Sequence, residues 1–307
     1  MTPPSHRPAP GPGFYALLLG ATFLMGSSFI AGKILLSRDV PPILLVGWRF
    51  LVAALATLPL LLAGRAPLAR SLWPPGMRAA HVPVVMAIGL LQTAAVMGLL
   101  FLGMRTIPAA AAAILLFSNP IWVALLGRLF LHERLGAVRL AGLLLGMAGV
   151  ALAIGPGALL QGQRAALFGE LCCLASALCW AVATTVNKRS ALPIGGLALN
   201  FWQMLLGALV LLAVALAAGQ RWPAGLAWHD WGWFAWLAIP ASTGSFGLWF
   251  EALRRGGATH ASGWLFLAPL FAVLLSFVVL HTTLAPSQWI GGAAIAAGLW
   301  LVNRRPA

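Results

Sequence analysis

Apolar runs of about 20 residues follow one another along almost the whole chain, separated by short breaks that hold charges, prolines or glycines. A run of that length crosses the ~30 Å hydrocarbon core of a bilayer as an α-helix, which satisfies its backbone polar groups internally. Only 8% of the 307 residues are charged and the mean hydropathy is +0.95, which does not suit a water-exposed surface. The sequence therefore excludes a soluble globular enzyme and predicts an all-α membrane protein.

Charges and Pro/Gly breaks divide the chain into ten predicted transmembrane helices. They are expected near residues 14–35, 41–63, 82–104, 108–131, 137–155, 166–187, 195–218, 231–253, 259–280 and 287–303. Residues 1–13 are predicted to form a polar, proline-rich tail, 156–165 a periplasmic linker and 304–307 a cytoplasmic tail.

The positive charges are distributed unevenly between the two sides of the membrane. With the N-terminus inside, 13 of the 19 Lys and Arg residues fall on the inner side and 6 on the outer side. Because positive residues collect in cytoplasmic loops, both termini are predicted to be cytoplasmic, with the chain in the cell (inner) membrane. The net charge of +14 is thus a sign of topology, and no nucleic-acid partner is expected.

An internal repeat relates the two halves of the chain. Sliding the sequence on itself by 149 residues pairs seven identical positions. They are Gly98 with Gly247, Phe101 with Phe250, Arg105 with Arg254, Pro120 with Pro269, His132 with His281, Gly142 with Gly291, and Gly149 with Gly298. Allowing for loop differences, Lys33 pairs with Lys188 and Trp48 with Trp202. Five predicted helices per repeat, 14–155 and 166–303, invert the second copy in the membrane, an arrangement typical of transporters.

Motifs for catalysis or cofactor binding are missing. There is no Walker A sequence, and HERLG at 132–136 lacks the second histidine of a zinc-binding HExxH motif. The three cysteines lie in one apolar segment, without a second cluster that would complete a zinc site. We therefore expect no catalytic residues, no metal and no cofactor, and any uphill transport would need an ion gradient.

Several segments resemble the EamA repeat of the drug/metabolite transporter superfamily. In the first half they are GSSFIAGK (26–33), GWRF (47–50), residues 100–135 and RLAGLLLGMAGVALA (139–153), while 169–189 and 247–302 are similar to the second copy. The resemblance implies a ten-helix exporter with cytoplasmic termini. Its cavity would be formed by helices one to four and six to nine, with helices five and ten set apart.

The resemblance also suggests substrates, because similar family members include exporters of amino acids, among them aromatic ones. One departure concerns the position before the mid-helix proline of the fourth and ninth helices, where many members carry Glu. This chain has Asn119 and Ala268 there. A mechanism that relies on those acids is therefore not expected.

Prolines in the fourth and ninth predicted helices are candidate hinges. Pro120 and Pro269 each lie about halfway along their span, where the missing N–H frees a carbonyl and kinks the helix. A fixed, packed kink is the alternative. Asn119, beside the first kink, is a candidate substrate ligand, or else hydrogen-bonds a neighbouring helix.

Two acids and one histidine are candidates for proton coupling. Glu170 and Glu251 are the acids that fall within predicted spans, where an ionisable group is usually functional. Alternatively, Glu251 forms a salt bridge with Arg254 and Arg255, and Glu170 stabilises a helix N-terminus. His260 is expected to be structural rather than a proton relay.

Other intramembrane polar and aromatic residues are candidates for the substrate cavity. The polar ones are Gln92 and Gln203, and the possible aromatic walls are Trp48, Phe117, Trp180, Trp202, Trp249 and Trp264. Aromatic walls suit apolar and aromatic solutes by stacking, although each Trp could instead pack helices or face lipid. Lys33 and Arg49 are expected to snorkel to the interface, or alternatively to attract a carboxylate-bearing substrate.

The sequence thus predicts an exporter of small amphipathic metabolites, above all amino acids including aromatic ones, that works by alternating access around a central cavity. The alternatives are a proton-coupled multidrug efflux transporter and a non-transporting membrane scaffold. The expected partners are a small-molecule substrate and the lipid bilayer. The oligomeric state stays open, and a monomer is compatible with the sequence.

Overall fold

The computed structural model describes residues 12–64, 66–130, 136–154, 164–261, 264–265 and 267–303, and no strand occurs among them. The helices of the first half are α1 (Pro12–Leu36), α2 (Pro42–Leu62), α3 (Leu68–Leu72), α4 (Val82–Gly89), α5 (Val96–Gly103), α6 (Ala109–Leu116), α7 (Asn119–Phe130) and α8 (Ala137–Ile154). Those of the second half are α10 (Arg164–Ser190), α11 (Gly196–Ala217), α12 (Trp228–Ala238), α13 (Ser245–Ala261), α14 (Leu267–Leu280) and α15 (Pro286–Asn303). A 3₁₀ turn, η1 (Ala79–His81), precedes α4.

Six helical segments within the described ranges are long and apolar enough to cross a membrane. They are Pro12–Leu36, Pro42–Leu62, Ala79–Gly103, Ala109–Phe130, Arg164–Ser190 and Gly196–Ala217. Two shorter apolar helices, Leu140–Gly149 and Leu267–Leu280, accompany them. The chain is thus a multi-pass membrane protein.

Wider π-helical turns interrupt two helical stretches, of which one, Ala79–Gly103, is among these six. One, η2 (Leu90–Ala95), joins α4 to α5, and the other, η3 (Ile239–Gly244), joins α12 to α13. The two segments are separated by the same 149 residues as the sequence repeat. The bounds of α8 and α15 have that separation as well, so the helix boundaries follow the internal similarity of the sequence.

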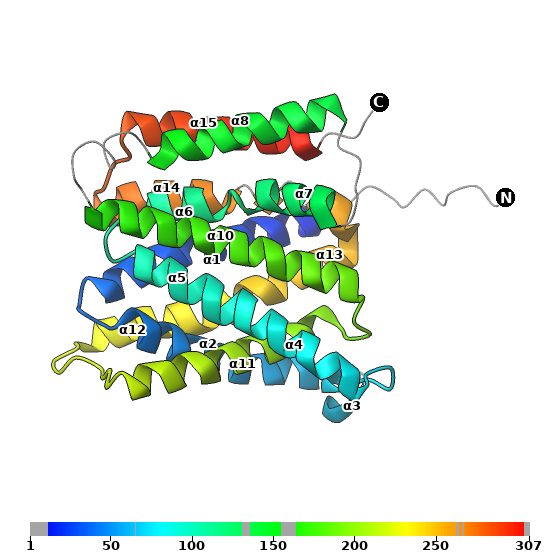
Figure 1. Cartoon of the computed structure of the whole chain (residues 1–307). Coiled ribbons are helices and arrows are strands. Elements are labelled where there is room, and N and C mark those ends of the chain that lie inside the picture. The colour runs from blue at the N-terminus through cyan, green and yellow to red at the C-terminus, as the bar shows by residue number, and fades with distance from the viewer. Residues whose placement is uncertain are drawn as a thin grey trace.

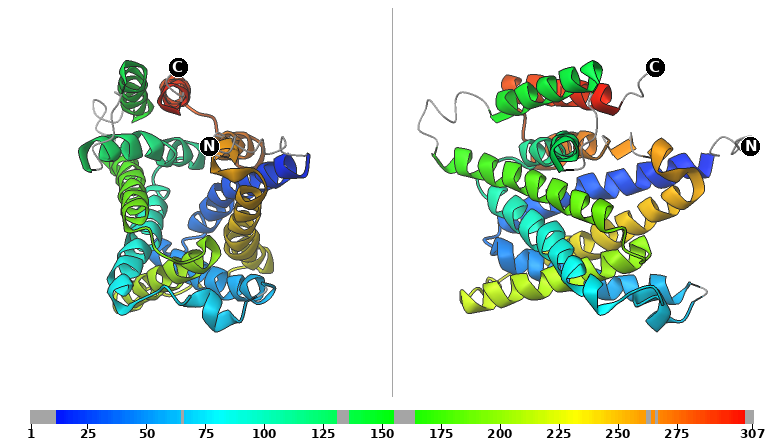
Figure 2. Two further views of the ribbon diagram at one scale, coloured as in Figure 1. Left: turned by 90° about the vertical axis from the view of Figure 1, so that its right-hand side faces the viewer. Right: turned by 45° about the vertical axis from the view of Figure 1, so that its right-hand side comes forward.

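Helices α8 and α15 pack against each other at one side of the bundle (Figures 1 and 2), where Ile114 of α6 and Ile121 of α7 lie against them. Glycines allow this close approach. A Cβ on Gly149 would lie 2.7 Å from the Ile295 nitrogen, and one on Gly298 would lie 2.6 Å from the Gly142 oxygen. The glycines of residues 142–149 therefore serve helix packing.

Several predicted boundaries differ from the structure. The bounds of the fourth predicted span, 108–131, agree with the segment Ala109–Phe130, but a turn at residues 117–118 divides this segment into α6 and α7. Helix α13 continues to Ala261, so the predicted loop after 253 is helical and the predicted start of the next span at 259 is wrong. Pairing of Glu251 with Arg254 and Arg255 along one helical face extends α13 past the point where charge suggested an end.

The predicted tails and linker lie largely outside the described residues. Only 12–13 of the N-terminal tail are described, and they already belong to α1. Of the linker 156–165, the last two residues begin α10, and the tail 304–307 falls outside the described ranges.

One end of the bundle is closed by a short turn between α5 and α6. Met104 and Ile107 in this turn are 0% and 3% exposed. The Lys33 Nζ, from α1, donates hydrogen bonds to the carbonyl oxygens of Met104 (2.6 Å) and Ile107 (2.9 Å). The turn is thereby tied to the end of α1.

Candidate functional site

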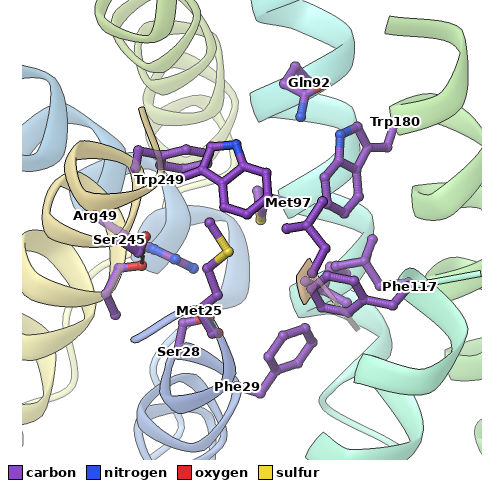
Figure 3. Close-up of a pocket in the computed structure, with 15 residues that line it drawn as sticks. Met25, Ser28, Phe29, Arg49, Gln92, Met97, Phe117, Trp180, Ser245 and Trp249 are labelled. Carbon is purple, nitrogen blue, oxygen red and sulfur yellow. Dashed lines mark hydrogen bonds between the residues drawn. The ribbon is translucent and has the colours of Figure 1, made fainter. Parts of the chain in front are cut away.

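A cavity of about 140 Å³ lies in the middle of the bundle, between helices of both halves (Figure 3). One ordered water needs about 10–15 Å³ by the same measure, so the cavity has room for several waters or a small solute. Its lining residues are Met25, Ser28, Phe29, Arg49, Gln92, Met97, Leu100, Leu116, Phe117, Trp180, Ala241, Ser245, Phe246, Trp249 and Leu265.

Pairs of repeat-related residues make up much of this lining. The pairs separated by 149 residues are Gln92 with Ala241, Met97 with Phe246, Leu100 with Trp249, and Leu116 with Leu265. Because both members of each pair line the same cavity, the two similar halves of the sequence meet there. Leu100 and Ala241 were not among the predicted site residues, and mapping the repeat onto Trp249 and Gln92 is the signal that could have found them.

Aromatic rings from α1, from α10 and from the break between α6 and α7 form one wall. The Phe117 ring lies 5.9 Å from Trp180 in an edge-to-face arrangement and 6.3 Å from Phe29. Phe117 reaches the cavity from the break between α6 and α7, where the Ser118 hydroxyl donates to the Leu115 oxygen at 2.6 Å. Trp249 lies across the cavity from this group (Figure 3). Such walls hold apolar and aromatic groups by dispersion and stacking.

Neutral polar groups on the lining differ in what they offer a ligand. Ser28 and Ser245 donate their hydroxyl hydrogens to carbonyl oxygens of their own helical segments, at 2.7 Å for Ser28 and 2.9 Å for Ser245. Their oxygens can therefore only accept from a ligand. Gln92 lies on η2, and its amide makes no hydrogen bond within the described ranges. It is thus free to donate or accept.

Arg49 is the cation of the lining, and the expectation that it snorkels to the interface is wrong. Its side chain lies inside the bundle, and the residue is 4% exposed. Its Nε donates to the hydroxyl of Ser242 in η3 at 2.9 Å, and Ser242 in turn donates to the carbonyl oxygen of Leu237 in α12 at 2.8 Å. The Phe50 and Phe101 rings lie 4.7 and 5.4 Å from the guanidinium carbon. The π turn of η3 therefore carries the Ser242 hydroxyl, which accepts a hydrogen bond from the inward-pointing Arg49 side chain.

Four of the predicted cavity residues line this cavity: Gln92, Phe117, Trp180 and Trp249. The others lie elsewhere. Trp48 is 39% exposed. Trp202 donates its indole N–H to the Leu72 oxygen at 3.0 Å, which ties α3 to α11.

Three further predicted residues also lie away from the lining. Gln203 donates to the Asn200 side-chain oxygen at 2.7 Å. The Trp264 ring lies 5.4 Å from Tyr15. Asn119 is 6% exposed, buried beside the helix break. How far each of these residues lies from the end of its predicted span did not indicate whether its side chain faces the cavity.

The two prolines occupy first turns of helices instead of mid-helix positions. Pro120 is the second residue of α7, and Pro269 is the third of α14. The missing N–H is tolerated in a first turn, since that group has no partner inside the helix. Each proline therefore marks a point where the predicted span is divided.

Glu170 and Glu251, two of the three candidate proton-coupling residues, lie outside the lining. Glu251 accepts hydrogen bonds from Arg254 and Arg255, with shortest N–O distances of 2.7 Å to each. Glu170 is 5% exposed, and its Oε2 has no hydrogen-bond partner among the residues that the structure describes. It adjoins Gly169, whose Cβ position would meet the turn between α5 and α6. The side chain of His260 lies outside the described residues.

Comparisons with known proteins agree over nearly the whole length. The sequence profile of the EamA-like transporter family matches residues 13–155 and, separately, 167–304. The chain is 26% identical to the uncharacterized transporter YoaV of Bacillus subtilis, over 92% of this chain and 94% of the relative. It is 27% identical to an uncharacterized transporter of Synechocystis, over 94% of this chain and 89% of the relative. A chloroplastic WAT1-related protein of Arabidopsis thaliana is 28% identical over 94% of this chain and 69% of its own.

A solved crystal structure shares the fold. It matches with a TM-score of 0.64 over 94% of this chain and 96% of that chain, at 20% sequence identity.

Proposed function

Since this chain belongs to the EamA-like transporter family, whose members are transporters and not enzymes, we propose that it exports small amphipathic metabolites by alternating access, with amino acids including aromatic ones as its main substrates. The central cavity carries this proposal. It is lined by rings and apolar side chains, with a few polar groups from helices of both halves. Such a lining suits a solute with one apolar and one polar end.

The topology that we propose has ten transmembrane helices in two inverted five-helix repeats, with both termini cytoplasmic in the cell membrane. The two separate profile matches and the two π segments 149 residues apart support the repeat. The end closed by Lys33 and the Met104–Ile107 turn is then the outer face, where few positive charges collect.

Alternating access in this arrangement requires elements that bend. We assign this role to the two π segments together with the helix breaks beside Pro120 and Pro269. π turns have weaker, displaced backbone hydrogen bonds and occur frequently at functional sites. Gln92 and Ala241, on the two π segments, both line the cavity, so bending there would change its shape.

Uptake of labelled phenylalanine into liposomes that hold the purified protein tests the function. Protein-free liposomes are the control, and the uptake is measured with and without an imposed pH gradient. Uptake that requires the protein supports the proposal, and its response to the gradient separates proton antiport from facilitated transport. A protein that moves neither phenylalanine nor any other amino acid contradicts amino acid export.

Solvent access to the cavity separates a transporter from a scaffold. Gln92→Cys, in a variant without the three native cysteines, is expected to react with a small water-soluble thiol reagent. A scaffold does not need a wetted interior, so an unreactive Cys at this position favours that alternative.

A further inference from the structure

Arg49 lines the transport cavity, and within the described ranges no carboxylate lies beside it. Of the acids in the described part of the chain, Asp39 is exposed, Asp230 pairs with Arg38, Glu251 pairs with Arg254 and Arg255, and Glu170 lies away from the cavity lining. The partners of Arg49 are one hydroxyl and two ring faces. The cavity therefore holds a positive charge that these described groups leave uncompensated.

A guanidinium removed from water is unfavourable unless it is paired. Ring faces and one serine recover part of the lost hydration but supply no negative charge. The Ser242 bond occupies Nε, which leaves the two terminal nitrogens as donors. Their planar geometry fits the two oxygens of one carboxylate, which Lys cannot match.

The repeat shows that the charge is placed on one side of the cavity only. Trp48 and Trp202 are repeat mates, so Gln203 is the counterpart of Arg49. Gln203 is neutral, bonds to Asn200 on its own helix and does not line the cavity. A symmetric lining would bind a solute in either orientation, whereas this one defines a polar end and an apolar end.

The apolar end faces the aromatic wall. Figure 3 shows Arg49 and Ser245 on one side of the cavity, with Phe117 and Trp180 on the other. A molecule whose carboxylate meets Arg49 would extend its apolar part towards those rings. Gln92 lies near Trp180 and is available to a second polar group of the molecule.

We propose that Arg49 is the carboxylate-binding subsite and that the substrates are amphipathic monocarboxylates, for which an ammonium group is optional. This inference rests on the proposed transport function and narrows its substrate class. It excludes amines and other cations without a carboxylate as good substrates, because they would place a second positive charge next to Arg49.

Three phenyl compounds of similar size test the subsite in the full-length purified protein. The first, 3-phenylpropionate, carries a carboxylate. The second, phenylalanine, carries a carboxylate and an amine, and the third, phenethylamine, carries only an amine. Calorimetric titration is expected to show binding of both acids and at least roughly tenfold weaker binding of the amine. Equal binding of phenethylamine and 3-phenylpropionate, or no binding of either acid, overturns the proposal.

Variants locate the effect on Arg49. Arg49→Gln is expected to weaken acid binding roughly 10- to 100-fold, the range for losing a charged hydrogen-bonding partner. The affinity of Arg49→Lys for the acids is expected to lie between those of wild type and Arg49→Gln. Lysine keeps the positive charge but lacks the two coplanar donors of the guanidinium group. Arg221→Gln removes an exposed positive charge outside the cavity and is the matched control. If Arg49→Gln does not fold, the ligand series and Arg49→Lys still decide the matter.

The outcomes separate this inference from the transport function. Protein-dependent uptake of phenylalanine that survives in Arg49→Gln retains the transporter and overturns the subsite. Uptake by wild type that is lost in Arg49→Gln and retained in Arg221→Gln supports both.

Discussion

The ammonium group of Lys33 lies 2.6 Å from the carbonyl oxygen of Met104, so that a charge on α1 holds the turn between α5 and α6. A second bond, to Ile107, makes the tie span the whole turn. Charge-assisted hydrogen bonds are about twice as strong as neutral ones. One side chain thus makes both of the hydrogen bonds that tie this end of the bundle to α1.

Replacing Lys33 is expected to loosen this closure. In Lys33→Met the turn loses both bonds, which should shift the opening equilibrium by roughly 10- to 100-fold. Cys173 is a native reporter, since it is fully buried and its sulfur lies 4.0 Å from the Leu100 oxygen beside the turn. With Cys172 and Cys179 replaced by Ser, Cys173 should react faster with a small maleimide in Lys33→Met. Ser37→Ala, which removes an exposed hydroxyl from the end of the same helix, should leave the labelling rate unchanged.

Replacing an aromatic residue of the cavity wall should weaken ligand binding more than replacing an aromatic residue outside the cavity. Trp180→Leu removes the ring that faces Phe117, and an aromatic pair contributes about 0.5–1.5 kcal/mol beyond its buried area. Binding of 3-phenylpropionate is therefore expected to weaken by roughly 2- to 12-fold. Trp48→Leu changes a tryptophan that is 39% exposed and does not line the cavity. Titration should show that Trp48→Leu binds 3-phenylpropionate with wild-type affinity. An equal loss of affinity in Trp48→Leu and Trp180→Leu would mean that lining the cavity does not decide the contribution of a tryptophan to binding.

The two acids should differ in any proton-coupled transport. Glu251 is paired with two arginines near the bundle surface. Ion pairs in such a setting contribute about 0–1 kcal/mol to the free energy of unfolding. Glu251→Gln should therefore keep nearly wild-type stability and should also keep gradient-dependent uptake. Glu170 is buried with an unpartnered oxygen at the closed end. If uptake responds to a pH gradient, Glu170→Gln is expected to abolish that response. The reverse result would assign coupling to Glu251.

Packing of α8 on α15 should not tolerate a side chain at Gly149. A Cβ there would approach the Ile295 nitrogen to 2.7 Å, so the helices must separate to admit alanine. We expect Gly149→Ala to reduce the free energy of unfolding by about 1–3 kcal/mol, as overpacking commonly does. A thermal shift in detergent measures this change. Gly232→Ala in α12 is the control, because no atom lies within 4 Å of its Cβ position and alanine favours a helix. Similar melting temperatures for the two variants would show that the contact is not tight.

The sequence by itself determined the class of protein and its internal similarity. Apolar length and scarce charge require helices in a bilayer, because nothing else satisfies the backbone there. The 149-residue offset follows from identical residues, and the helix bounds of α8 and α15 repeat it. It also indicated Gln92, Phe117, Trp180 and Trp249 as candidate cavity residues, and these line the cavity.

Only the tertiary structure decided which way the other side chains point. Within a uniformly apolar span, hydropathy barely distinguishes the face towards a cavity from the face towards lipid. Thus Trp48 and Arg49 are neighbours in sequence, yet the tryptophan is exposed and the arginine lines the cavity. The π segments were equally hidden, since one extra residue in a helical turn leaves no mark on composition, although it rotates all that follows. The placement of the buried charge therefore came from helix rotation and packing, which the pattern of residues along the chain does not record.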